Sequence, residues 1–62
     1  MDLTPKQKAF ADEFLKCGNA TEAAKRAGYS EQSARQMGTE NLSKPSISSY
    51  IQERQKQIDD EA

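Results

Sequence analysis

Residues 20–42 read ATEAAKRAGYSEQSARQMGTENL, and this stretch decides the fold. Two segments with helical periodicity meet at Gly28-Tyr29-Ser30. Gly28 suits a left-handed turn conformation that other residues adopt only at a cost, and Tyr29 is expected to fill the gap below the turn. Because helices joined by so short a connection cross steeply, the stretch predicts a helix-turn-helix over about residues 20–42.

The segment before the turn carries a thin apolar stripe. Asn19 is its expected N-cap. The stripe consists of Ala20, Ala23, Ala24 and Ala27. Alanine lets a second helix approach closely, where leucine or phenylalanine would hold it away. Ala24 lies four residues before Gly28, where the motif needs a small residue, so we expect the next helix to pack directly onto these alanines.

The segment after the turn has an inner face. Ser30 is the expected N-cap of this helix, and Glu31 complements the positive helix end. The inner face is formed by Ala34, Met37, Gly38 and Asn41. Ala34 and Met37 are expected to anchor the helix to the core. Gly38 costs about 1 kcal/mol of helix stability relative to alanine, so its presence predicts close helix packing.

The opposite face of the same helix lies about 160° away, at 100° per residue. It consists of Gln32, Arg35, Gln36 and Thr39. Arginine can bind guanine through two hydrogen bonds, glutamine can bind adenine similarly, and threonine can serve several bases. These four residues are therefore the predicted base-reading set of a recognition helix in the major groove. Since most polar helix faces are solvated, an ordinary solvent-facing helix is the alternative interpretation.

Cations and a hydroxyl flank this helix. The predicted phosphate-contacting residues are Lys25, Arg26, Ser30 and Lys44. Lys6 and Lys8 fall in the first turn of another predicted helix, where cations oppose the helix dipole, and this hints at an anionic partner. Lysines of this kind more often serve solubility. With a net charge of −1, one copy is expected to bind DNA weakly, and several copies would be needed for useful affinity.

Two further helices complete the predicted domain. Residues 4–7 read TPKQ, a helix start with a capping box and an early proline, and Gly18 is the expected stop. The last helix is expected to begin around Pro45. Its apolar stripe is interrupted after Arg54, so its final turns are expected to fray or to continue into a further segment.

The predicted fold class is all-α, a compact four-helix domain that contains a helix-turn-helix. A chain of 62 residues holds one domain at most. We assign residues 1–52 to the helix-turn-helix DNA-binding domain. Residues 53–62 are expected to extend the last helix or to form a linker toward an oligomerisation core.

Composition excludes several classes of function. The chain has no histidine and one cysteine, so it can form neither an internal disulfide nor a Cys/His zinc site of its own. No apolar run approaches membrane-spanning length. The chain lacks a nucleophile, base and orienting group arranged for catalysis. We therefore expect a protein that is not an enzyme, that uses no cofactor or metal, and that does not associate with membranes.

The order of these residues resembles a known family. The resemblance is clearest in residues 3–7 (LTPKQ), 18–24 (GNATEAA) and 26–30 (RAGYS). The similarity continues through Ala34, Gly38, Glu40-Asn41-Leu42, Lys44-Pro45, Ile47 and Tyr50-Ile51. Over residues 3 to about 52, the chain is similar to the small subunit of phage DNA-packaging terminases.

The resemblance implies more than the residues themselves. Such subunits recognise the packaging initiation site on double-stranded viral DNA, assemble into homo-oligomeric rings and regulate a separate large subunit that holds the ATPase and nuclease. Their N-terminal helix-turn-helix is followed by an oligomerisation core and by a segment that contacts the motor. The present chain would be the first of these parts, monomeric by itself and located in the host cell cytoplasm.

Two other functions fit the residues around the turn. One is a transcriptional or transposase-type helix-turn-helix DNA binder, which a neighbouring large-subunit gene would argue against. The other is a helical module that docks on a partner protein. DNA binding weakens steeply with salt, whereas a mainly apolar protein interface does not, so salt dependence separates these two classes.

Overall fold

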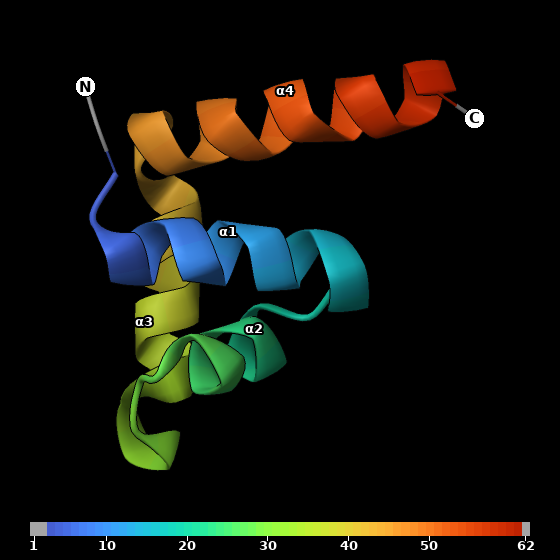
Figure 1. Cartoon of the computed structure of the whole chain (residues 1–62). Coiled ribbons are helices and arrows are strands. Elements are labelled where there is room, and N and C mark those ends of the chain that lie inside the picture. The colour runs from blue at the N-terminus through green and yellow to red at the C-terminus, as the bar shows by residue number, and fades with distance from the viewer. Residues whose placement is uncertain (1–2, 62) are drawn as a thin grey trace.

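The computed structural model describes residues 3–61, which form four α-helices (Figure 1). These are α1 (Pro5–Cys17), α2 (Ala20–Ala27), α3 (Glu31–Ser43) and α4 (Pro45–Glu61). Within this part of the chain there is no strand, so the predicted all-α fold class is confirmed. Residues 1, 2 and 62 lie outside the described residues. They belong to the outer ends of the predicted domain (residues 1–52) and of its predicted extension (residues 53–62).

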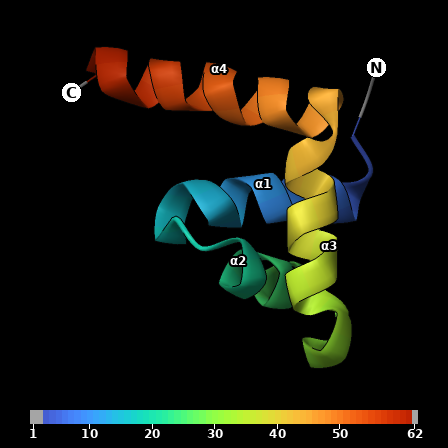
Figure 2. The same cartoon turned by 180° about the vertical axis from the view of Figure 1, so that it is seen from behind.

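The helices cross in two directions. α1 lies between α2 and α4. α3 runs transverse to these helices, packs against α2 and leads into the start of α4 (Figures 1 and 2). α1 and α4 point the same way, and α4 continues past the end of α1 in both views. The principal extents of the domain are 36 × 24 × 17 Å, and the long dimension reflects the projecting end of α4.

Local sequence fixes the ends of α1 and α2. The Thr4 Oγ1 accepts from the Gln7 N–H at 3.1 Å, and the Gln7 Oε1 accepts from the Thr4 N–H at 3.1 Å, so the capping box is complete. At Gly18 the backbone turns left-handed, with φ 68°, and the helix ends there. Asn19 then caps α2 by accepting from the Glu22 N–H at 3.0 Å. These starts and stops lie where the sequence predicts them.

Gly28 makes the turn between α2 and α3. Its φ is 107°, and its N–H donates to the carbonyls of Ala24 and Lys25. The Tyr29 N–H also donates to the Ala24 carbonyl, at 3.0 Å. These bonds bend the chain within three residues, and α3 leaves at a steep angle to α2 (Figure 2). The arrangement is consistent with the helix-turn-helix that residues 20–42 predict.

Gly38 lets α3 lie directly on α2. A Cβ atom at this position would stand 2.7 Å from the carbonyl oxygen of Ala20 and 3.1 Å from the Ala20 Cβ. No real side chain tolerates such a distance to backbone without a shift of the helices. The close packing predicted for Gly38 is therefore present, and it fixes where the two helices cross.

The core is small and rich in alanine. Its fully buried hydrophobic residues are Phe10, Ala11, Ala23, Ala24, Ala34 and Ile47. Met37 was expected to anchor α3 beside Ala34, but it is only half-buried, whereas Asn41 is fully buried. The reason is angular, because Ala34, Gly38 and Asn41 centre the buried face and Met37 lies at its edge, about 40° beyond Asn41 at 100° per residue.

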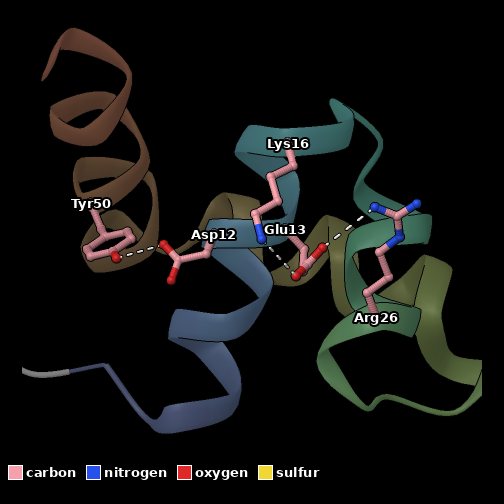
Figure 3. Close-up of polar contacts among 5 residues, drawn as sticks. All are labelled: Asp12, Glu13, Lys16, Arg26 and Tyr50. Carbon is pink, nitrogen blue, oxygen red and sulfur yellow. Dashed lines mark hydrogen bonds and ion pairs between the residues drawn. The ribbon is translucent and has the colours of Figure 1, made fainter. Parts of the chain in front are cut away.

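A polar contact joins α4 to α1 beside the apolar packing. The Tyr50 hydroxyl donates to the Asp12 carboxylate at 2.8 Å (Figure 3). This bond, together with burial and the negative charge of Asp12, raises the pKa of Tyr50 above its ordinary value of 10.0. Beyond Ile51 every described side chain of α4 is exposed, and the helical geometry extends to Glu61.

None of the four helices is long and apolar enough to span a membrane, as far as the described residues 3–61 reach.

Candidate nucleic-acid interface

The outer face of α3 brings the predicted base-reading residues together. Gln32, Arg35, Gln36 and Thr39, called the reading face below, are all exposed. With Glu40 they line one shallow depression on the surface. The face lies opposite the buried residues of α3, so the fold points it away from the domain.

Two side chains of the reading face, Arg35 and Thr39, differ in whether their hydrogen-bond donors are already in use. The Arg35 guanidinium forms no ion pair with any residue that the structure describes. Thr39 has already committed its hydroxyl hydrogen, because its Oγ1 donates to the Arg35 carbonyl at 3.1 Å. Arg35 can therefore donate to guanine or phosphate without first breaking a contact, whereas Thr39 is set to accept from a base.

Ser30 occupies the N-cap position of α3, but its side chain does not cap the helix. The hydroxyls of Ser30 and Ser33 bond to each other at 2.8 Å instead. The prediction that the Ser30 side chain caps α3 is therefore wrong, although Ser30 does occupy the N-cap position. The Ser33 hydroxyl, at the third position of the helix, bonds to the Ser30 hydroxyl. As a result, no side-chain oxygen of Ser30 occupies the N–H groups of the first turn of α3.

The structure pairs two of the four predicted phosphate-contacting residues with acids. Lys25 lies 3.8 Å from the Glu31 carboxylate, and Arg26 lies 3.6 Å from that of Glu13. Glu13 also contacts Lys16, at 3.6 Å (Figure 3). Surface pairs of this kind contribute only about 0–1 kcal/mol, so a DNA phosphate can displace the carboxylate. The pairs lower the effective positive charge beside α3.

Lys44 stands at the other end of α3. It is the C-cap residue of that helix, and its N–H donates to the Asn41 carbonyl at 3.1 Å. Its side chain is half-exposed and has no acidic partner within residues 3–61. Lys44 is therefore available to a phosphate at the end of the reading face that lies farthest from the turn.

The structure adds a contact at the turn that sequence analysis missed. The Lys6 ammonium stands over the Tyr29 ring, 4.8 Å from its centroid. The Tyr29 hydroxyl in turn accepts from the buried Asn41 amide nitrogen at 3.3 Å. Lys6 and Tyr29 are far apart in the sequence, so no local pattern connects them. The position of Lys6 at a positive helix end was the one available signal.

Comparison with known proteins identifies the family. A family model described as "Terminase small subunit" matches residues 3–62. The chain belongs to the terminase small subunit family. The resemblance seen in the sequence is thereby confirmed.

Individual terminase small subunits are similar over nearly the whole chain. The protein of Bacillus phage SF6 is 49% identical over 59 residues, which are 94% of this chain and 41% of that protein. That of Bacillus phage SPP1 is 47% identical over 57 residues, 90% of this chain and 39% of its own. That of Staphylococcus phage 80alpha is 42% identical over 60 residues, 95% and 41% respectively. The chain thus spans about two fifths of the length of these terminase small subunits.

Proposed function

We propose that this chain is the DNA-recognition domain of a terminase small subunit and binds duplex DNA at the viral packaging initiation site. The observation that supports this proposal is the exposure of the reading face. A tight turn at Gly28 projects α3 so that Gln32, Arg35 and Gln36 lie exposed together, with Arg35 unpaired among the described residues. Amide and guanidinium groups on one helix face are suited to reading base edges in the major groove.

The proposal assigns two kinds of contact. The reading face approaches the bases, while Lys25, Arg26, Ser30 and Lys44 contact phosphates. Residues 1–52 form this DNA-binding domain, and residues 53–62 lead toward an oligomerisation core. Within the whole protein, several copies form a ring in the host cytoplasm and regulate a separate large ATPase-nuclease subunit. The small subunit itself catalyses no reaction.

The charge distribution favours binding by several copies together. The net charge is −1, and Lys25 and Arg26 must exchange their carboxylate partners for phosphates. A single domain therefore gains little electrostatic affinity. Copies held in one assembly bind in concert, because each bound domain raises the effective DNA concentration at its neighbours. Weak binding by one domain is consistent with recognition by the assembly.

The proposal is tested by NMR titration with a duplex that carries the packaging-initiation sequence, against a scrambled duplex of the same length and composition. Shifts centred on residues 25–44 and on the side chains that border them support it. Arg35→Gln should remove the preference for the packaging sequence, because it removes the two-bond contact to guanine. Arg54→Gln is the matched control, since Arg54 carries the same charge on the exposed part of α4.

Two results would overturn this function. One is the absence of shifts with either duplex at high protein and DNA concentrations. The other is a set of shifts concentrated on α4. Binding to a partner protein instead of DNA is recognised by its salt dependence, because DNA affinity falls steeply as salt rises and an apolar interface does not.

A further inference from the structure

Lys6 is held at the α2–α3 turn by the side chain of Tyr29. Its Nζ lies 4.8 Å from the ring centroid, and its Cε lies 3.5 Å from where a Cβ of Gly28 would stand. Figure 2 shows α3 crossing in front of α1 near the start of α1. The ammonium group thus stands beside the turn that leads into the reading face.

The charge of Lys6 is not neutralised by the protein. The first turn of α1 contains no acidic residue, and Lys6 forms no ion pair with the residues that the structure describes. The N-terminal end of α1 is itself positive, which makes a cation there locally unfavourable. Lys25 and Arg26 differ in this respect, because each already faces a carboxylate.

The aromatic ring holds the ammonium and leaves it able to bind an anion. A cation over a ring is attracted by the electron-rich face and uses none of its capacity for ion pairing. An ammonium has three N–H donors, and those directed away from the ring remain free to donate. The ring is fixed in turn, since the Tyr29 N–H donates to Ala24 and its hydroxyl accepts from the buried Asn41.

We propose that Lys6 contacts a DNA phosphate beside α3, and that Tyr29 is the positioning residue that holds its ammonium group there. This inference rests on the proposed DNA-binding function and adds a residue of α1 to its surface. A phosphate contact carries no sequence information. Lys6 should therefore contribute equally to the affinity for any duplex and should account for about one phosphate in the salt dependence.

Lys8 provides a matched control on the same helix. It has the same charge and is exposed, but it lies two residues on, about 200° around α1 from Lys6. The affinities of Lys6→Gln, Lys8→Gln and Lys6→Arg for the packaging-site and scrambled duplexes are measured by fluorescence anisotropy over a range of salt concentrations. Circular dichroism melts establish that all three variants fold.

We expect Lys6→Gln to weaken binding to both duplexes by about three- to tenfold and to reduce the slope of log affinity against log salt by about one. Lys6→Arg should keep the wild-type slope, since arginine also binds phosphate and stacks on aromatic rings. Lys8→Gln should change the slope by clearly less than Lys6→Gln.

Equal effects of Lys6→Gln and Lys8→Gln would overturn the inference, because only overall charge would then matter. A loss confined to the packaging sequence would overturn it too, since Lys6 would be reading bases. If the wild type discriminates between duplexes and Arg35→Gln abolishes this, the proposed function stands even where the Lys6 inference fails. If the wild type binds neither duplex, the proposed function fails, and the inference fails with it.

Discussion

The Cα of Gly38 packs against the backbone of Ala20 at the crossing of α2 and α3. A Cβ at Gly38 would stand 2.7 Å from the Ala20 carbonyl oxygen and 2.9 Å from its carbonyl carbon. Both are backbone atoms, so neither can rotate out of the way. The angle at which α3 presents its reading face therefore depends on the absence of one side chain.

Gly38→Ala should destabilise the domain although alanine is the better helix former. The gain in helix propensity is about 1 kcal/mol. The overlap with the Ala20 backbone should cost more than this, about 2–3 kcal/mol, so we expect a net loss of about 1–2 kcal/mol in the free energy of unfolding. Urea denaturation followed by circular dichroism measures it.

Ser49→Ala is the control for that substitution, because Ser49 is exposed within α4. It should leave stability unchanged or raise it by about 0.5 kcal/mol. A Gly38→Ala variant as stable as Ser49→Ala would show that the helices separate without cost and that the crossing is not fixed by this contact.

Tyr29→Phe should destabilise the domain, because the Tyr29 hydroxyl is hydrogen-bonded to the buried Asn41. Asn41 is fully buried, its amide nitrogen donates to the Tyr29 hydroxyl at 3.3 Å, and its Oδ1 has no partner among the described residues. Removing the Tyr29 hydroxyl leaves the buried Asn41 amide without a hydrogen-bond partner among the described residues. We therefore expect a loss of about 1–3 kcal/mol in the free energy of unfolding, measured by thermal or urea denaturation. The double variant Tyr29→Phe/Asn41→Leu removes both polar partners and should recover most of this loss. A double variant no more stable than Tyr29→Phe would contradict the explanation.

Glu13→Gln should increase DNA affinity. Glu13 holds Arg26 and Lys16 at 3.6 Å each, and the substitution frees Arg26, which is one of the proposed phosphate contacts. We expect binding to tighten by about two- to fivefold at low salt, with a steeper salt dependence, measured by fluorescence anisotropy. Glu53→Gln makes the same change in net charge on the exposed part of α4. If Glu53→Gln tightens binding as much, then net charge, and not the release of Arg26, governs affinity.

The Tyr50–Asp12 bond should make stability depend on pH in the alkaline range. The folded state raises the pKa of Tyr50, so it favours the protonated hydroxyl more than the unfolded chain does. This contribution is complete below the ordinary pKa of 10.0 and is lost as pH rises through the raised value.

Comparison with Tyr50→Phe isolates that effect. The variant should lose about 1 kcal/mol near neutral pH, equivalent to about 4–8 °C in Tm. The difference in Tm between the wild type and Tyr50→Phe should then shrink above about pH 10, because the wild type loses the same bond. A difference that stays constant across this range would show that the hydroxyl contributes nothing through its protonated form.

Much of the fold follows from local sequence. Three local signals each act within a few residues of the chain. They are the capping box at Thr4, the left-handed backbone at Gly18 and Gly28, and the stripe of small residues in α2. Such signals are readable because caps and turns use backbone groups close in sequence. The reading face follows from helical spacing once α3 is placed, and the chain's order of motifs was enough to indicate its family.

Contacts between distant residues were decided by tertiary structure alone. Lys6 meets Tyr29, Glu13 meets Arg26, and Asp12 meets Tyr50 because the four helices cross where Gly38 and the alanines allow them to. Spacing along one helix gives the face on which a side chain lies, but not the residue that faces it from another helix. The sequence by itself therefore determined which cations lie next to α3 along the chain. The packing decided which cations face a carboxylate and which, like Lys6, come to the turn from another helix.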